Sequence, residues 1–359
     1  MADAAVRDVS GLSEAAIRAA FRNQAEACAA LGSPFTAALC AGLADRLDRT
    51  NAFGRRVLDW RCDDPGPSGD SVPLRACGAL HALVLAGVAP ALGRAYPPNV
   101  GAPDMGTVLA AIAANDDWLA AFLDSPPQTN ETARAGAIWP MLALVAGRTG
   151  LPIRLLEVGA SAGLNLRLDG FRYDLGGVRS GPADGGVRIA PDWRGAAAPE
   201  FVPEIVARAG CDIAPVDPTD PAQALRLRAY CWPDQAERRA RLEAAIELAA
   251  RASVPVVAQD AVAFLRERLA EPVSGVLTVV FSTVAWQYLP AAARETGEAV
   301  IEEAGARATT DAPLAWVRME ADGATPGAGL TLRLWPHGQG RTERPGRADF
   351  HGRWVDWRV

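Results

Sequence analysis

The stretch RLLEVGASAGLNLRLDG, residues 154–170, constrains the fold of this chain more than any other feature. An apolar run ends at Glu157, small residues follow at alternate positions (Gly159, Ser161 and Gly163), and a leucine-rich segment comes next. This order predicts a strand, a tight turn and the start of a helix. Two chemistries fit these letters. G-x-S-x-G is the pattern of a hydrolase nucleophile elbow, and E-x-G-x-x-x-G is typical of a turn that holds a nucleoside cofactor.

The elements on the two sides of this stretch differ in kind. Only helices are predicted before it, over 13–48 (broken by GSP at 32–34), 72–87, 106–123 and 131–147. Strands alternate with helices after it, which is the signature of a parallel α/β sheet. We therefore predict a helical N-terminal domain or cap over 1–135 and a Rossmann-like α/β domain over 136–359.

The predicted α/β domain has a mostly parallel sheet and ends in an antiparallel hairpin. Its strands are expected over 154–158, 212–217, 254–260, 275–283 and 313–320, with two more in the C-terminal tail. A hairpin is predicted as an insertion near 171–200. The clearest helix covers 234–252, where Asp234 and Glu237 are spaced as a capping box.

Composition removes several classes of protein. All 36 basic residues are arginine, because the sequence contains no lysine, so Schiff-base chemistry, pyridoxal phosphate attachment and a P-loop lysine are excluded. The net charge of −6 argues against a nucleic-acid partner and against docking on an acidic membrane. The three histidines and six cysteines show no metal-ligand spacing, so we predict no metal site.

The sequence also bears on the cellular compartment in which the protein is expected. The N-terminal residues do not read as a signal peptide, and no apolar run has membrane-spanning length, so a soluble, cytoplasmic protein is expected. The cysteines, mostly in apolar segments, are interpreted as small buried side chains in a reduced compartment. A small-molecule substrate is expected, and the oligomeric state stays open.

Acidic residues at strand ends give the first indication of a ligand. In an open α/β sheet, ligands bind beyond the carboxyl ends of the strands, where Glu157, Asp217 and Asp260 are expected. Carboxylates accept hydrogen bonds from the hydroxyls and the exocyclic amine of a nucleoside. The pattern resembles the class I S-adenosylmethionine-dependent methyltransferases, which implies S-adenosylmethionine as the cofactor. The predicted cofactor-binding residues are Glu157, Gly159, Ala160, Ser161, Gly163, Asp217 and Asp260.

Two features depart from that class. Ser161 stands where the fold usually has a glycine, and the inserted hairpin lengthens the distance from the turn to Asp217. Asp169 or Asp174 is therefore an alternative for the ribose side. Dinucleotide binding is disfavoured, because G-x-G-x-x-G is not satisfied.

Residues for the substrate side come from two polar segments and from the opening stretch itself. The polar segments are SPPQTNETAR (125–134), which a functional interpretation places over the turn, and FSTVAWQYLP (281–290), although helix capping and core packing explain them equally well. The candidates are Asn130, Arg134, Asn165, Asp169, Ser282, Trp286, Gln287 and Tyr288. No catalytic residue is singled out, because methyl transfer depends largely on proximity and alignment.

A serine hydrolase that uses Ser161 is the least favoured reading. His337 and His351 follow the serine, in the order that such triads use. However, no HGGG-like oxyanion segment precedes the turn, and helices stand where strands are required. A nucleophile also leaves Glu157 unexplained.

Five segments together resemble a known family. They are PPQTNE, LLEVGASAGLNLRLD, CWPDQAERRARLEAA, VVFSTVAWQYLP and HGRWVDW, and they resemble a bacterial family named domain of unknown function 2332. The resemblance covers the chain from residue 24 to the C-terminus and implies a methyltransferase-like Rossmann fold behind a helical region. The family usually has a histidine at the position of Ser282. We predict a methyltransferase of unknown small-molecule substrate, with a non-catalytic ligand-binding or regulatory protein on the same fold as the alternative.

Overall fold

The computed structural model describes residues 13–67 and 69–359. They form two compact units. Unit 1 comprises the described part of Met1–Thr129 together with Pro221–Ala240, and unit 2 comprises Asn130–Asp220 and Arg241–Val359. The domain division after residue 135 stays a prediction, because compactness alone does not define a domain that folds independently.

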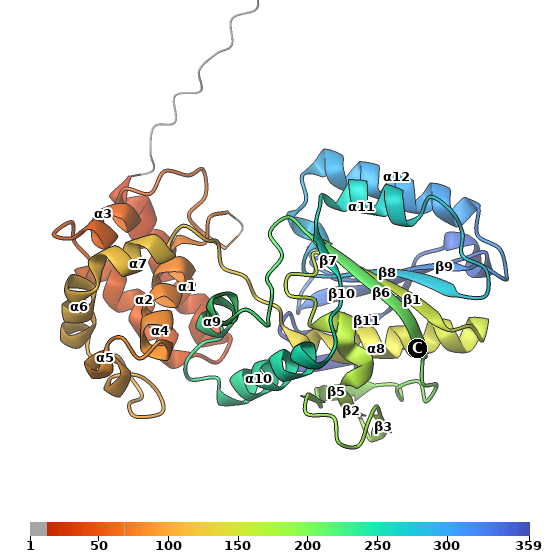
Figure 1. Cartoon of the computed structure of the whole chain (residues 1–359), viewed down its shortest axis with the longest axis horizontal. Coiled ribbons are helices and arrows are strands. Elements are labelled where there is room, and N and C mark those ends of the chain that lie inside the picture. Colours follow the sequence, from red (N-terminus) through yellow and green to blue (C-terminus); the bar gives the residue numbers. More distant parts are fainter. Residues whose placement is uncertain (1–12, 68) are drawn as a thin grey trace, which may run out of the picture. The chain divides into compact units, whose positions relative to one another are not determined.

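The regular structure described in unit 1 is helical (Figure 1). Its helices are α1 (Glu14–Ala30), α2 (Pro34–Arg46), α3 (Ala52–Leu58), α4 (Val72–Leu85), α5 (Pro90–Arg94), α6 (Met105–Ala114), α7 (Asp116–Phe122), α9 (Pro221–Ala229) and the first turn of α10 (Ala236–Arg251). Ser13 caps α1 by accepting a hydrogen bond from the Ala16 N–H. The helix predicted over 106–123 is two helices, because Asn115 between them has a non-helical φ of −131°.

An apolar core lies inside the described part of unit 1. It contains fully buried aromatic side chains from α1, α2 and α3, namely Phe21, Phe35 and Phe53. The six cysteines of the chain are free thiols, and five of them are buried, whereas Cys62 is partly exposed. The interpretation of the cysteines as buried side chains therefore holds for all but Cys62.

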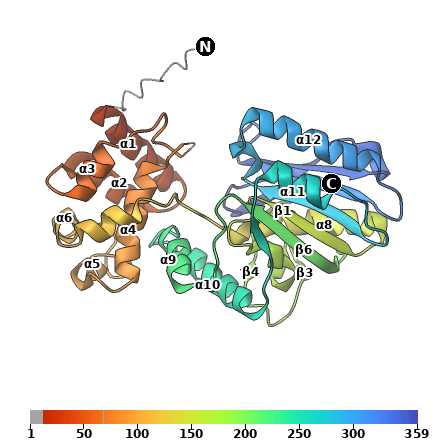
Figure 2. The ribbon, with the colours of Figure 1, turned by 45° about the horizontal axis from the view of Figure 1, so that its top comes forward.

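Unit 2 is a mixed α/β unit (Figures 1 and 2). Its strands are β1 (Ile153–Val158), β2 (Arg172–Leu175), β3 (Val178–Ser180), β4 (Arg188–Ile189), β5 (Asp192–Gly195), β6 (Ile205–Asp212), β7 (Val256–Ala258), β8 (Leu277–Thr283), β9 (Leu314–Glu320), β10 (Ala328–Trp335), β11 (Glu343–Ala348) and β12 (Trp354–Trp357). Its helices are η1 (Thr132–Arg134), α8 (Ala135–Thr149), η2 (Asn165–Gly170), the rest of α10, α11 (Ala261–Arg268), η3 (Trp286–Tyr288), α12 (Ala291–Ala306) and η4 (His337–Gly340).

The main sheet has the strand order β5-β12-β11-β10-β9-β8-β1-β6-β7. The neighbours from β7 to β9 are parallel, whereas β10, β11 and β12 each run antiparallel to the strand before them. The prediction of an α/β fold with a large, mostly parallel sheet is confirmed. The tail contains three strands rather than the predicted two, because residues 336–342 separate β10 from β11.

Two local predictions were wrong. The strand predicted over 212–217 is β6, which ends at Asp212. Arg208 inside β6 breaks the apolar pattern, but its guanidinium is paired with Asp169 (Nη1 to Oδ1, 2.6 Å). The helix predicted after the turn is the six-residue 3-10 segment η2, in which Arg167 leaves helical geometry. The insertion near 171–200 is a small sheet, β3-β2-β4, followed by β5 at the edge of the main sheet.

Helices cover both faces of the main sheet. Figure 1 shows α11 and α12 on one face and α8 on the other. Leu156 and Val158 of β1 belong to the core under α11 and α12, together with Phe264 and Trp316. Because successive strand residues point to opposite faces, Glu157 lies on the face of α8.

Candidate functional site

The glycine turn, residues 159–163, leaves the carboxyl end of β1. Gly159, Ser161 and Gly163 have φ values of 72°, 52° and 64°, a region that glycine enters without steric cost. A Cβ at Gly159 would collide with Cβ of Ala285, and one at Gly163 would lie 2.7 Å from Cγ2 of Val256. The backbone conformation and the close neighbours together explain the spacing of small residues in the sequence.

The end of β6 holds this turn in place. The carbonyl oxygen of Cys211 accepts hydrogen bonds from the first two N–H groups of the turn, at 3.0 and 2.9 Å. Oδ2 of Asp212 accepts from the Ser161 N–H at 2.8 Å, and Oδ1 accepts from the Ala214 N–H at 3.0 Å. Each carboxylate oxygen has a second lone pair, so Asp212 can still accept a hydrogen bond from a ligand hydroxyl.

Glu157 is a buried carboxyl group beside the turn, only 1% exposed. Burial raises its pKa well above the ordinary value, and the negative charge of Asp212 raises it further, whereas Arg134 and Arg167 oppose the shift. Among the described residues, Oε2 of Glu157 has no hydrogen-bond partner. A buried polar atom without a partner is costly, so Oε2 is positioned to bind a hydrogen-bond donor or a cation.

The other two predicted acids lie in different settings. Asp260 follows β7 and caps α11, with Oδ1 accepting from the N–H groups of Val262 and Ala263 at 2.8 and 3.1 Å. Its exposed side chain stays at the carboxyl edge of the sheet, two residues after β7 ends. Asp217 is exposed five residues beyond the end of β6, and Oδ1 accepts from the N–H and hydroxyl of Thr219. The strand-end acid next to β1 is therefore Asp212 and not Asp217.

The segment before α8 contacts the residues that follow the glycine turn. Oδ1 of Asn130 accepts from the Leu164 N–H at 2.8 Å, and Nδ2 of Asn165 donates to the Glu131 carbonyl at 3.3 Å. Oε1 of Glu131 accepts from the Ala133 N–H at 3.1 Å. The structure thus brings two of the predicted substrate-side residues, Asn130 and Asn165, together at the turn.

Arg134 connects two further segments. Its Nη1 donates to the Thr283 carbonyl at the end of β8 (3.0 Å), and its Nε donates to the Phe350 carbonyl (2.9 Å). Its positive charge also favours the ionised form of Glu157. Arg134 therefore lies at the carboxyl edge, within electrostatic range of the buried carboxyl group.

The loop after β8 is held by Glu320, the last residue of β9. The Glu320 carboxylate accepts from the Ser282 hydroxyl at 2.8 Å and from the backbone N–H groups of residues 285–287 at 3.1–3.3 Å. Val284 in this loop has a φ of 53°, which is unfavourable for a β-branched residue. Val280 belongs to the core under α11 and α12, and Ser282 lies two residues further along β8 and so on the same face of the sheet. Glu157 lies on the other face, that of α8, so Ser282 and Glu157 are on opposite faces.

The remaining substrate-side candidates do not form one surface. Asp169 is paired with Arg208 through both oxygens, at 2.6 and 2.7 Å. Trp286 packs edge-on against Trp316 in the core, at 5.2 Å between ring centroids. Oε1 of Gln287 accepts from the Ala321 N–H at 2.8 Å, and only Tyr288, 58% exposed, offers an open side chain.

Sequence reasoning missed Asp212 and Glu320. Both end strands, and the criterion that selected Glu157 applies to them equally. Asp212 was placed at the start of a strand, because Arg208 concealed β6. Glu320 was placed correctly at the end of a predicted strand but was not counted as a candidate.

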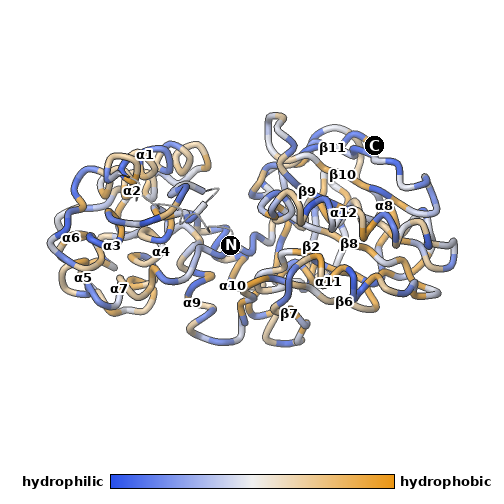
Figure 3. Tube along the Cα trace, turned by 90° about the horizontal axis from the view of Figure 1, so that it is seen from above, coloured by the Kyte–Doolittle hydropathy of each residue, from blue (hydrophilic) through white to orange (hydrophobic). Residues whose placement is uncertain are grey.

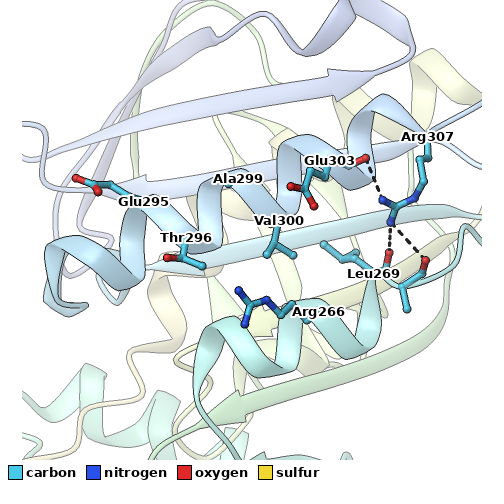
Figure 4. A pocket seen from close by; sticks show the side chains of 9 residues that line it. Arg266, Leu269, Glu295, Thr296, Ala299, Val300, Glu303 and Arg307 are labelled. Atoms are coloured by element: carbon cyan, nitrogen blue, oxygen red, sulfur yellow. Dashed lines mark hydrogen bonds between the residues drawn. The ribbon is translucent and has the colours of Figure 1, made fainter.

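A separate groove of about 660 Å³ lies between α11 and α12 (Figure 4). Nη2 of Arg307 donates there to the carbonyls of Leu269 and Ala270, at 2.8 and 3.4 Å. None of the predicted site residues lines this groove. It is therefore distinct from the carboxyl edge that carries the glycine turn.

Neither a metal cluster nor a membrane-spanning helix is found in the part of the chain that the structure describes. Residues 13–67 and 69–359 contain no group of three or more His, Cys, Asp or Glu side chains placed to hold a metal ion. Hydropathy changes repeatedly along the chain (Figure 3), and none of the helices described is both long enough and apolar enough to span a bilayer.

The fold and the turn define a class: an α/β protein with a glycine turn at the strand-order reversal of a largely parallel sheet. After β1 the chain builds β6 and β7 on one side and then crosses to β8 on the other, which is where open α/β sheets bind ligands. The chain belongs to the family described as "Uncharacterized protein conserved in bacteria (DUF2332)", whose model matches residues 18–357. None of the curated proteins compared with the chain matches it.

Proposed function

We propose that the chain binds S-adenosylmethionine at the carboxyl edge of β1, β6 and β7 and transfers its methyl group to a small-molecule acceptor. The observation that carries the proposal is Oε2 of Glu157, which is buried beside the glycine turn and has no partner in the described chain. The α-ammonium group of the cofactor would supply the missing donor and a compensating positive charge.

The neighbouring residues fit the rest of the cofactor. Asp212 would accept hydrogen bonds from the ribose hydroxyls, in place of Asp217, and the exposed Asp260 would accept from the amine of adenine. Ile213 follows Asp212 and is 80% exposed, so the adenine ring would cover an apolar side chain that now faces water. Gly159 lets Ala285 of the loop after β8 pack closely against the turn, which holds the edge of the proposed site in shape.

When bound, S-adenosylmethionine supplies a methyl group on a positively charged sulfur. The residues of the chain would bind and orient this group, and the buried setting of Glu157 would strengthen its attraction to a cation. Such a transfer depends largely on proximity and alignment, so it requires no nucleophilic side chain in the protein. Ser161 then serves as a small turn residue whose N–H is held by Asp212.

Calorimetric titration of the full chain with S-adenosylmethionine and S-adenosylhomocysteine tests the proposal. We expect micromolar binding of both and a loss of at least tenfold in affinity in the E157A variant. E271A, at an exposed glutamate, is the matched control. Absence of binding at millimolar ligand would contradict the proposal, and labelling of Ser161 by a fluorophosphonate would favour the hydrolase instead. Binding without methyl transfer to any acceptor would favour the non-catalytic alternative.

A further inference from the structure

A second cluster of buried polar groups lies beside the glycine turn. Glu131 is its centre: its carbonyl accepts from Nδ2 of Asn165 at 3.3 Å, and its Oε1 lies 3.4 Å from Nη2 of Arg241. The Glu131 side chain is 2% exposed and that of Arg241 is 21% exposed. Asn165 begins η2, two residues after Gly163 at the end of the turn, and Arg241 lies in the second turn of α10. The proposed cofactor contacts do not use this cluster.

Two atoms of the cluster lack partners. Oδ1 of Asn165 and Nε of Arg241 are both buried, and neither has a hydrogen-bond partner within residues 13–67 and 69–359. Asn165 is only 1% exposed, so its amide oxygen is shielded from bulk water. Buried polar groups in folded proteins are nearly always paired, and those that are not call for a ligand or an ordered water. One of the two is an acceptor and the other is a donor.

Charge indicates what kind of group would pair with them. The positive charge of Arg241 lies opposite the negative charge of Glu131, so the guanidinium already has a carboxylate as its counterpart. A ligand with a net charge would add a further buried charge beside this ion pair. A neutral group with one acceptor and one donor leaves the ion pair as it is.

We propose that Asn165 and Arg241 bind a neutral carboxamide of the methyl-acceptor substrate. The carbonyl oxygen of the amide would accept from the Arg241 Nε–H, and its N–H would donate to Oδ1 of Asn165. This inference rests on the proposed function, because it treats the cluster as the acceptor side of the same site. It gives the substrate a chemical class that the cofactor contacts alone do not supply.

Matched pairs of amide and acid test the inference. Saturation-transfer NMR on the full chain, with and without saturating S-adenosylhomocysteine, would compare benzamide with benzoate and nicotinamide with nicotinate. We expect the amides to bind and the acids to bind at least fivefold more weakly. R241K keeps the positive charge next to Glu131 but removes the Nε–H, and N165L replaces the amide by an apolar side chain of similar size, which removes the acceptor Oδ1. Each should weaken amide binding at least tenfold, whereas R251K, on the last turn of α10, should not.

The outcomes separate the two proposals. Lost amide binding in R241K with unchanged affinity for S-adenosylhomocysteine supports the inference. If the acids bind as well as the amides, if no amide binds, or if R241K lowers only the affinity for S-adenosylhomocysteine, the inference is overturned. Amide preference in a chain that binds no S-adenosylhomocysteine supports the cluster and contradicts the cofactor. Melting curves show whether each variant is folded. If N165L is unfolded, the R241K variant alone decides the question.

Discussion

The Ser161 N–H donates to Oδ2 of Asp212 at 2.8 Å, and this bond ties the turn after β1 to the end of β6. The same carboxylate accepts from the Ala214 N–H through its other oxygen. One side chain therefore fixes the loops that follow two adjacent parallel strands. Any ligand bound beyond these strands depends on the position of both loops.

Replacing Asp212 should destabilise the protein and remove ligand binding together. D212A leaves two backbone N–H groups without their acceptor, which costs on the order of 2 kcal/mol of unfolding free energy. We expect denaturant unfolding to show this loss and calorimetry to show at least a tenfold lower affinity for S-adenosylhomocysteine. D217A, in the exposed loop beyond β6, should leave that affinity unchanged. If D217A weakens binding and D212A does not, the proposed ribose-binding role returns to Asp217.

The turn itself could be predicted from the sequence, and its partner could not. The spacing of Gly159, Ser161 and Gly163 is a local requirement of backbone geometry, so the residues that meet it are adjacent in the chain. Asp212 meets Ser161 only through the pairing of β6 with β1. That strand was concealed by Arg208, whose charge is neutralised by Asp169, a residue 39 positions away. Pairings between distant residues leave no periodic signal in the chain.

Contacts between distant parts of the chain also decide which substrate-side candidates are buried and which are exposed. Trp286 and Tyr288 are two residues apart and look equivalent in the sequence. Packing against Trp316 buries the first, whereas the second stays exposed. Gly297 on α12 makes room for the Trp286 indole, since a Cβ there would lie 2.7 Å from its ring. The space that holds the Trp286 indole is formed by α12 and β9, so the sequence around Trp286 alone does not predict its burial.

Stability should fall with rising pH because of Glu157. Its folded-state pKa is raised above the unfolded value, so the folded chain holds the proton more tightly than the unfolded chain. The stabilisation from this proton is complete below the unfolded pKa and is lost as pH rises toward the raised folded pKa. E157Q, which carries no titrating proton, should flatten this dependence and be more stable than the natural chain at neutral pH.

Denaturant unfolding at several pH values measures this effect. E271Q, at an exposed glutamate, should reproduce the pH profile of the natural chain. An E157Q profile that parallels the natural one would show that Glu157 is not the titrating group. If E157Q is more stable but binds the cofactor more weakly, the Glu157 carboxyl group serves ligand binding at a cost to the stability of the fold.

Glu320 should matter more to the loop after β8 than Ser282 does. E320A removes the acceptor for the Ser282 hydroxyl and for three backbone N–H groups, and we expect a loss on the order of 3 kcal/mol. S282A removes one of these donors and leaves the others paired, so about 1 kcal/mol is expected. Unfolding experiments give both values, and hydrogen exchange at the N–H groups of 285–287 should accelerate in E320A alone. Equal effects of the two substitutions would show that the backbone donors are satisfied in another way.

Gly159 and Gly150 make a matched pair for testing the glycine turn. Both have positive φ, 72° and 69°, so alanine at either position costs about 1 kcal/mol through the backbone alone. Nothing lies within 4 Å of a Cβ at Gly150, whereas a Cβ at Gly159 collides with that of Ala285. G159A should therefore lose on the order of 3 kcal/mol of unfolding free energy and its affinity for S-adenosylhomocysteine, and G150A should lose about 1 kcal/mol and keep that affinity. Equal losses in denaturant unfolding would mean that the loop after β8 moves aside to accept the extra methyl group, and the close contact between the two loops would then not shape the site.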